Sequence, residues 1–81
     1  MLDAVVVGRV IQRFREERKR SQELVSGFAG IGRTHLSAIE RGERKPTLET
    51  LFRIAEALGV KPSVIIAAIE YELENADYLD K

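Results

Sequence analysis

Apolar residues recur along the chain at the three- and four-residue spacing that places one side of an α-helix against a core. The pattern indicates no strand, so we expect an all-α fold with five helices. These helices run from about Ala4 to Arg18, from the N-cap Ser21 to Gly30, from Gly32 to Arg41, from the N-cap Thr47 to Gly59, and from Pro62 to about Ala76.

Local signals mark the ends of these helices. Ser21 and Thr47 each precede a helical pattern, where a hydroxyl accepts hydrogen bonds from the free amides of the first turn. Gly30 and Gly59 each follow one, where a left-handed backbone is common and costs glycine nothing. Pro62 suits the first turn of a helix. The helix between Thr47 and Gly59 therefore has well-marked boundaries.

The apolar stripes also predict which residues face the core. After the turn at Gly30, Ile31 is expected to return to it. The other expected core residues are Val6, Val10, Ile11 and Phe14 in the first helix, Leu24, Val25 and Phe28 in the second, Leu36 and Ile39 in the third, and Leu48, Leu51, Ile54, Ala55 and Leu58 in the fourth.

The stretch from Ser21 to Gly42 is the most informative part of the chain. It predicts two short amphipathic helices joined by a glycine-centred turn. The outward face of the second helix is small, polar and basic, and it consists of Arg33, Thr34, Ser37, Ala38 and Arg41. This arrangement points to a helix-turn-helix unit that binds nucleic acid.

The last helix is apolar around the whole circumference of its first turns, so it needs cover on more than one side. One face should close the core, and a second copy of the chain is the expected cover for the other. We therefore expect a two-fold homodimer with Ile65, Ile66, Ile69 and Leu73 at its interface. Such a dimer would place two recognition helices roughly 34 Å apart on a symmetric operator. Apolar residues simply left exposed are the alternative.

Composition fits one domain that spans residues 1–81, with its core at about residues 8–69. The formal net charge is zero, but residues 1–45 hold ten Lys or Arg against six Asp or Glu, and residues 46–81 hold three against seven. This asymmetry would turn the basic half toward phosphate groups. The alternative is that these charged side chains only occupy solvent-exposed helix faces.

The chain has no cysteine, which excludes disulfides and thiolate metal sites and fits a reducing compartment. No apolar run reaches the length of a membrane span, and the first residues lack the pattern of a signal peptide. We therefore expect a cytoplasmic protein without a membrane partner.

Several fragments together resemble the lambda-repressor and Cro-like helix-turn-helix family, the XRE-type transcriptional regulators. They are SQE at 21–23, AGI at 29–31, IERG at 39–42, PTLETL at 46–51, IA at 54–55 and ALGV at 57–60. The resemblance covers about residues 8–69. The run Arg33-Thr34-His35 also resembles the start of the recognition helix in restriction-modification controller proteins. The resemblance implies a five-helix DNA-binding domain that regulates transcription and has double-stranded DNA as its partner.

Four residues are expected to contact DNA bases. Arg33 and Thr34 open the third helix, at the end that enters the major groove, and Ser37 and Ala38 lie one turn further on the same face. Arginine can bind the edge of guanine through two hydrogen bonds, and the smaller side chains can contact other base edges. For Arg33 the alternative is a phosphate contact without sequence preference.

Other residues are expected to contact phosphates. Gln22 matches the family residue that has this role, and the positive end of the helix dipole would assist it. For His35 the alternative is a purely structural role. For Arg41, Arg44 and Lys45, which flank the loop after the third helix, the alternative is that they only increase solubility. The full expected set is Gln22, Arg15, His35, Arg41, Arg44 and Lys45.

The resemblance also implies one ion pair. In related phage repressors an arginine of the first helix pairs with the glutamate that closes the recognition helix, and Arg15 and Glu40 stand at the matching positions. The pair would hold the guanidinium of Arg15 toward the DNA backbone. As an exposed pair it would contribute at most about 1 kcal/mol, so its expected purpose is orientation.

Three residues depart from the family pattern. Gly32 stands where Ser or Thr usually caps the recognition helix, and Gly27 lies inside a helix at a cost of about 1 kcal/mol against alanine. Ala38 replaces what is often a long polar residue that reads bases. We therefore expect the shape and deformability of DNA to contribute to specificity.

The sequence carries no pattern for catalysis. The glycines of 27–32 lie in a helix and a turn with no strand before them, so they form no phosphate-binding loop. The single His35 has no partner for nucleophilic or metal chemistry. The acidic residues Glu70, Glu72, Glu74, Asp77 and Asp80 have the spacing of a solvated helix end. We expect no enzyme activity, no metal, no cofactor and no small-molecule effector.

One other class of function stays open. The chain could be an antitoxin or adaptor whose main partner is another protein, bound through the apolar last helix and the acidic tail. The basic face of the third helix favours the DNA-binding interpretation.

Overall fold

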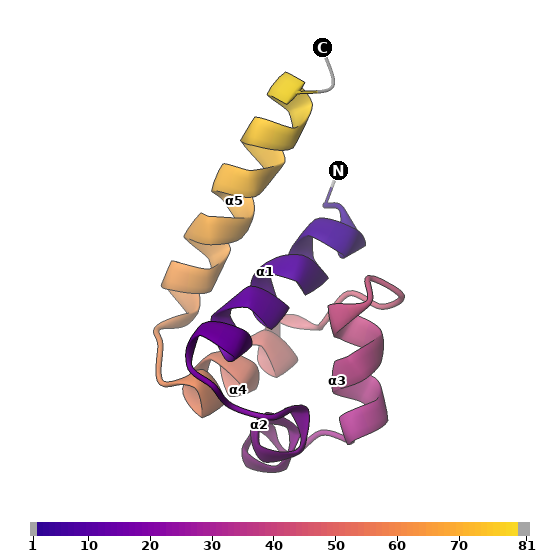
Figure 1. The fold of residues 1–81 in the computed structure, drawn as a ribbon, viewed down its shortest axis with the longest axis vertical. Coiled ribbons are helices and arrows are strands. Elements are labelled where there is room, and N and C mark those ends of the chain that lie inside the picture. Colours follow the sequence, from indigo (N-terminus) through magenta and orange to yellow (C-terminus); the bar gives the residue numbers. More distant parts are fainter. Residues whose placement is uncertain (1, 80–81) are drawn as a thin grey trace.

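Five α-helices make up the part of the chain that the structure describes (Figure 1). The computed structural model describes the backbone of residues 2–79 and the side chains of residues 2–75. The helices are α1 (Ala4–Glu17), α2 (Gln22–Ala29), α3 (Arg33–Glu40), α4 (Leu48–Leu58) and α5 (Pro62–Leu79). The expected all-α fold is confirmed, and α5 is three residues longer than the sequence indicated.

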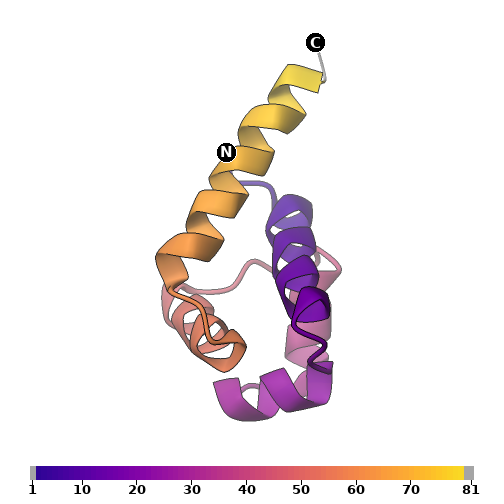
Figure 2. The same ribbon diagram turned by 60° about the vertical axis from the view of Figure 1, so that its left-hand side comes forward.

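Helix α1 lies between α3 and α5. Figure 1 shows α5 on one side of α1 and α3 on the other, and α1 packs against both. The turned view in Figure 2 shows α4 and α5 on one side of the molecule and α2 across its lower end, where α2 contacts α3 and α4. The end of α5 projects beyond the other helices in both views. Helices α3 and α5 therefore present separate surfaces.

The residues at the helix ends form the expected caps. The hydroxyl of Ser21 accepts a hydrogen bond from the Leu24 amide at 3.0 Å, and the hydroxyl of Thr47 accepts one from the Thr50 amide at 3.1 Å. Gly30 and Gly59 take left-handed backbone conformations with φ of 70° and 73°. All four predicted end signals are confirmed. The cap of α1, the Asp3 carboxylate, was not predicted.

Most of the predicted core is confirmed. Leu36, Ile39 and Ile54 lose all exposed surface, and they come from α3 and α4. The other residues that were predicted correctly are Val10, Ile11, Phe14, Val25, Leu51, Ala55 and Leu58. Ile31 is half-buried against this cluster.

In α1 and in α2, one predicted core residue was misplaced by one position. Val7 is buried where Val6 was expected, and Val6 is only half-buried. In α2, Ala29 is buried while Phe28 is 74% exposed, and Leu24 is exposed as well. Apolar neighbours such as these lie about 100° apart around a helix, so either could belong to the stripe. Tertiary packing decides between them.

Leu48 is also exposed, against expectation. It occupies the first turn of α4, and the buried stripe of that helix starts one turn later, at Leu51. The apolar surface of Leu48 faces solvent in the monomer.

Helix α5 contributes directly to the core. Ile65 is fully buried and Ile69 is 6% exposed. Their assignment to a dimer interface is corrected, because neither has surface left for a partner. Ile66, which is exposed, and Leu73, which is half-buried, retain surface on this helix.

Two glycines allow α1 to approach the end of α3 closely. A Cβ atom on Gly8 would lie 2.2 Å from the carbonyl oxygen of Ile39 and 2.7 Å from that of Glu40. Gly42 has φ of 80°, and a Cβ atom there would lie 2.8 Å from the Cα atom of Val5. The backbone of α1 is therefore in contact with the C-terminal end of α3. This role of Gly8 is not evident from the apolar pattern of the sequence.

We predict that Gly8→Ala lowers the free energy of unfolding by about 2 kcal/mol or more, because the added methyl group meets backbone atoms that cannot rotate away. The matched control is Gly27→Ala. Apart from the neighbouring backbone of its own helix, no atom lies within 4 Å of a Cβ atom at Gly27, so alanine there should stabilise helix α2 by about 0.5 to 1 kcal/mol. Urea denaturation followed by circular dichroism gives both values. Equal effects of the two substitutions would contradict the close approach of α1 and α3.

Candidate nucleic-acid interface

Helices α2 and α3 and the turn between them form a helix-turn-helix unit. The amide of Gly30 donates to the Gly27 carbonyl at 3.3 Å, and the amide of Ile31 donates to the Ser26 carbonyl at 3.0 Å. These bonds end α2 and reverse the chain, so that α3 starts after Gly32. The N-cap Gly32 provides no side chain, so the first turn of α3 lacks a side-chain cap.

The outer face of α3 carries the residues expected to contact bases. Arg33 and Thr34 are exposed at the start of the helix. Ser37 and Ala38, one turn later, are half-buried, as is His35. Thr34, His35 and Ala38 line one open hollow together with Glu43 and Arg44 from the following loop. The structure therefore brings two of the four expected base contacts, Thr34 and Ala38, next to that loop.

A buried carboxylate, that of Glu40, joins the three helices behind this face. The Nε atom of Arg15 donates to Glu40 Oε2 at 2.7 Å, and the Nη2 atom donates to Oε1 at 3.0 Å. The side-chain amide of Gln22 donates to the same Oε1 at 3.0 Å. The side chains of Glu40 and Arg15 are only 2% and 12% exposed. We call Arg15, Gln22 and Glu40 the Glu40 network.

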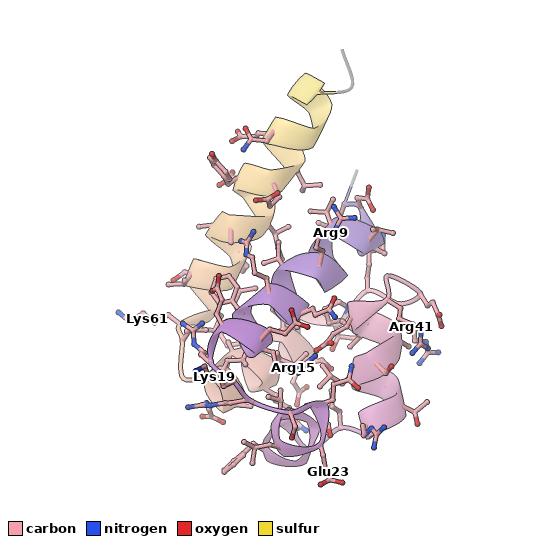
Figure 3. The ribbon with its side chains drawn as sticks, viewed as in Figure 1. Arg9, Arg15, Lys19, Glu23, Arg41 and Lys61 are labelled. Carbon is pink, nitrogen blue, oxygen red and sulfur yellow. The ribbon has the colours of Figure 1, made fainter. Side chains whose placement is uncertain are left out.

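The ion pair implied by the resemblance is therefore confirmed, but it is not an exposed pair. Figure 3 shows Arg15 reaching from α1 into the space beside α3. Its Nη1 atom also donates to the carbonyl of Arg20 at 2.8 Å, in the loop before α2. The hydrogen bond to Glu40 raises the pKa of Arg15 above its ordinary value, against the effect of burial. Arg15 thus carries its charge inside the protein.

A second network lies on the outside of α3. Arg41 donates from Nε to Glu43 Oε2 at 2.7 Å and from Nη2 to Glu43 Oε1 at 3.1 Å. Its Nη1 atom donates to the hydroxyl of Ser37. The hydrogen bonds and charge of Glu43 raise the pKa of Arg41, and those of Arg41 lower the pKa of Glu43. We call Ser37, Arg41 and Glu43 the outer network. Glu43 was not predicted from the sequence, although it is the one acid in the basic segment 41–45.

Fewer positively charged residues lie near α3 than the basic composition of residues 1–45 suggested. Figure 3 shows Arg41 beside α3, while Lys19 and Lys61 lie on the opposite side of the molecule. Arg13 pairs with Glu72 of α5 at 3.3 Å, and Arg20 donates to the carbonyl of Ala57. The exposed cations on or next to α3 are Arg33, Arg41, Arg44 and Lys45.

An apolar surface lies on α4 and α5, away from α3. Leu48 is 66%, Phe52 52% and Ile66 44% exposed. Leu48 and Ile66 border a hollow of about 300 Å³, which Leu2 and Pro46 also line. We call Leu48, Phe52 and Ile66 the α4–α5 face.

The side chains of residues 2–75 include no group of three His, Cys, Asp or Glu that could hold a metal ion. The side chains of Asp77 and Asp80, which the sequence placed in a solvated helix end, lie outside the described residues. Within residues 2–79, none of the helices has the length and apolar character that crossing a membrane requires.

We predict that Arg15→Met lowers the free energy of unfolding by about 3 to 5 kcal/mol, because it leaves the buried Glu40 carboxylate without its cation. The control is Arg53→Met, which breaks an exposed pair with Glu49 and should change stability by less than about 1 kcal/mol. Thermal unfolding followed by circular dichroism distinguishes the two. If Arg15→Met lowers the free energy of unfolding as little as Arg53→Met does, the Glu40 network contributes little to stability.

Comparisons with known proteins agree with this geometry. Residues 11–65 match the family described as helix-turn-helix (HTH_3). An uncharacterized HTH-type transcriptional regulator of Sinorhizobium fredii, y4dJ, is 44% identical over 55 residues, which are 68% of this chain and 71% of the relative. The immunity repressor protein of Bacillus phage phi105 is 39% identical over 78 residues, 95% of this chain, but the chain spans only 54% of that repressor.

Among solved structures, the restriction-modification controller protein C.AhdI from Aeromonas hydrophila superimposes with a TM-score of 0.76 at 28% sequence identity. The match covers 80% of this chain and 98% of C.AhdI. The resemblance to XRE-type regulators and to controller proteins is thereby confirmed. Because the family match includes both helices of the unit and most of the core, the chain belongs to the helix-turn-helix family.

Proposed function

We propose that this protein is a transcriptional regulator that binds a symmetric site on double-stranded DNA as a homodimer, with α3 in the major groove. The observation that carries the proposal is the exposed polar and basic face of α3, fixed from behind by the Glu40 network. A helix that contacts bases needs an orientation that stays the same when the protein binds DNA. The names of the relatives, which include a repressor and controller proteins, support the same function.

Base reading is assigned to the start of α3. Arg33 and Thr34 are the most exposed of the expected contacts, and the N-terminal end of a recognition helix lies deepest in the groove. Arg33 can bind guanine O6 and N7 through two hydrogen bonds. Ser37 and Ala38 lie further along the same face and are half-buried, so they have less surface for a base.

Phosphate contacts are assigned to the residues around this face. Gln22 is half-buried at the first turn of α2, with its amide nitrogen bonded to Glu40. Arg44 and Lys45 are exposed in the loop after α3, and His35 lines the hollow beside that loop. The guanidinium of Arg15 is bonded within the protein, so we assign it no direct phosphate contact. Arg15 instead holds Glu40 in place and, through Glu40, the side chain of Gln22.

Dimerisation is assigned to the α4–α5 face. An exposed apolar surface on a small domain marks an interaction site, and a second copy would cover Leu48, Phe52 and Ile66. Leu73, half-buried on the same side of α5 as Ile66, extends this face. Because α1 separates α5 from α3, two copies joined here leave both recognition helices free.

Selection from a randomised duplex pool at near-physiological salt tests the proposal. We expect the wild-type protein to enrich two inverted half-sites about one helical turn apart. Arg33→Ala should lose about 1 to 3 kcal/mol of binding free energy and relax the preference at one base position of each half-site. The control Arg53→Ala removes an exposed arginine of α4 and should leave the enriched site unchanged.

Absence of any enriched motif, with binding that vanishes as salt rises, would contradict the proposal. That outcome would favour the function as an antitoxin or adaptor that binds another protein. An Arg33→Ala protein that loses affinity but keeps the wild-type base preference would reassign Arg33 to a phosphate.

The dimer interface has its own test. Ile66→Glu should convert the dimer to a monomer in sedimentation equilibrium, because a dimer would bury the new carboxylate without a partner. Val64→Glu is the matched control. Val64 is 46% exposed, close to the 44% of Ile66, and it lies about 200° away around α5. If Val64→Glu gives the monomer and Ile66→Glu does not, the interface lies on the opposite face of α5.

A further inference from the structure

The outer network places a carboxylate on the surface that α3 would present to DNA. Glu43 follows the recognition helix by three residues and lines the same hollow as Thr34 and Ala38. A carboxylate in that place repels phosphate groups. Yet it is held there by both of its oxygens, because each accepts a hydrogen bond from Arg41.

The same contacts fix how Arg41 can act. Its Nε and Nη2 atoms donate to Glu43, and its Nη1 atom donates to Ser37. One further N–H group remains on Nη1 and one on Nη2. The edge formed by Nη1 and Nη2 is one that can bind two acceptors at once, as on the edge of guanine. These hydrogen bonds therefore favour one orientation of Arg41 before DNA binds.

The charges of the two groups have opposite effects on binding. Arg41 alone would attract any phosphate, whatever the sequence. Glu43 cancels most of that attraction at longer range, because the pair has no net charge. The other titratable groups at the hollow are His35 and Arg44, and no second acid among the described residues lines it. Glu43 is thus the group that reduces the positive charge of this loop.

We infer that Glu43 determines how well this protein distinguishes its operator from other DNA, by holding Arg41 in place with its end-on edge free. The inference rests on the proposed DNA-binding function. On the operator, the held edge of Arg41 meets the acceptors for which it is oriented. On other sequences Arg41 cannot turn to the nearest phosphate without breaking its bonds to Glu43. Glu43 is a positioning residue, because it acts through Arg41.

The test compares Glu43→Gln with the wild-type protein on two duplexes, the one that the wild type enriches and a scrambled duplex of the same length and composition. Dissociation constants are measured by fluorescence anisotropy between about 50 and 200 mM salt. We expect Glu43→Gln to bind the scrambled duplex about threefold more tightly, with a plot of log K against log salt that is steeper by about 0.9, the effect of one additional phosphate contact. Affinity for the operator should rise less, so the ratio of the two affinities falls.

Two further variants separate the role of Glu43 from the loss of a negative charge. Glu49→Gln removes a carboxylate from another exposed arginine pair, on α4, and should leave both the ratio and the salt slope unchanged. In an Arg41→Gln background, Glu43→Gln should no longer steepen the salt slope, because Glu43 has no arginine to release. The side chains of Arg41 and Glu43 are more than half exposed, so these variants keep the core intact.

The inference is overturned if Glu43→Gln behaves like Glu49→Gln at every salt concentration, or if it changes affinity for the two duplexes by the same factor. It is also overturned if the steeper slope persists without Arg41. A wild-type protein that binds both duplexes equally contradicts the proposed function itself, and the role of Glu43 with it. If the wild type is selective and Glu43→Gln binds both duplexes as the wild type does, only the role of Glu43 is contradicted.

Discussion

One buried carboxylate, that of Glu40, holds together the three helices on which the candidate DNA surface depends. Its two oxygens accept hydrogen bonds from Arg15 on α1 and Gln22 on α2, while Glu40 itself ends α3. A charge with so little exposure is tolerable only with a full set of partners, and among the described residues every buried side-chain nitrogen or oxygen has one. The geometry of three helices is thereby fixed at one point.

The apolar core surrounds this point and completes the fold. Helix α1 contacts α3 through the backbone at Gly8 and contacts α5 on its other side, where Ile65 and Ile69 close the interior. Because the same helix supports both, the surfaces of α3 and of the α4–α5 face keep a fixed relation to each other. For a dimer that spans two half-sites, this relation sets their spacing.

The order and type of the helices could be predicted from the spacing of apolar residues. Their ends could be predicted because the hydroxyls of Ser21 and Thr47 and the left-handed backbone at Gly30 and Gly59 act within a few residues. The choice between neighbouring apolar residues could not be predicted. Val6 and Val7, or Phe28 and Ala29, satisfy the same periodicity, and only contact with another helix selects one. For Ile65 and Ile69 the sequence could not show that the monomer core uses the surface that a dimer would need.

At the candidate site, family resemblance identified the pair of Arg15 and Glu40 but not its burial, which depends on how closely three helices meet. Glu43 was missed because a single acid in a basic loop looks like an unpaired surface charge until its bonds to Arg41 are seen.

The contact of α1 with the end of α3 at Gly8 has a consequence for how such proteins diversify. Since α3 is anchored by main-chain atoms and by Glu40 at its inner side, the exposed residues Arg33 and Thr34 can change identity without disturbing what holds the helix. New operators can then be acquired by substitution on one face, with the scaffold inherited unchanged. The same separation makes this chain a suitable framework for engineering binding to chosen DNA sequences.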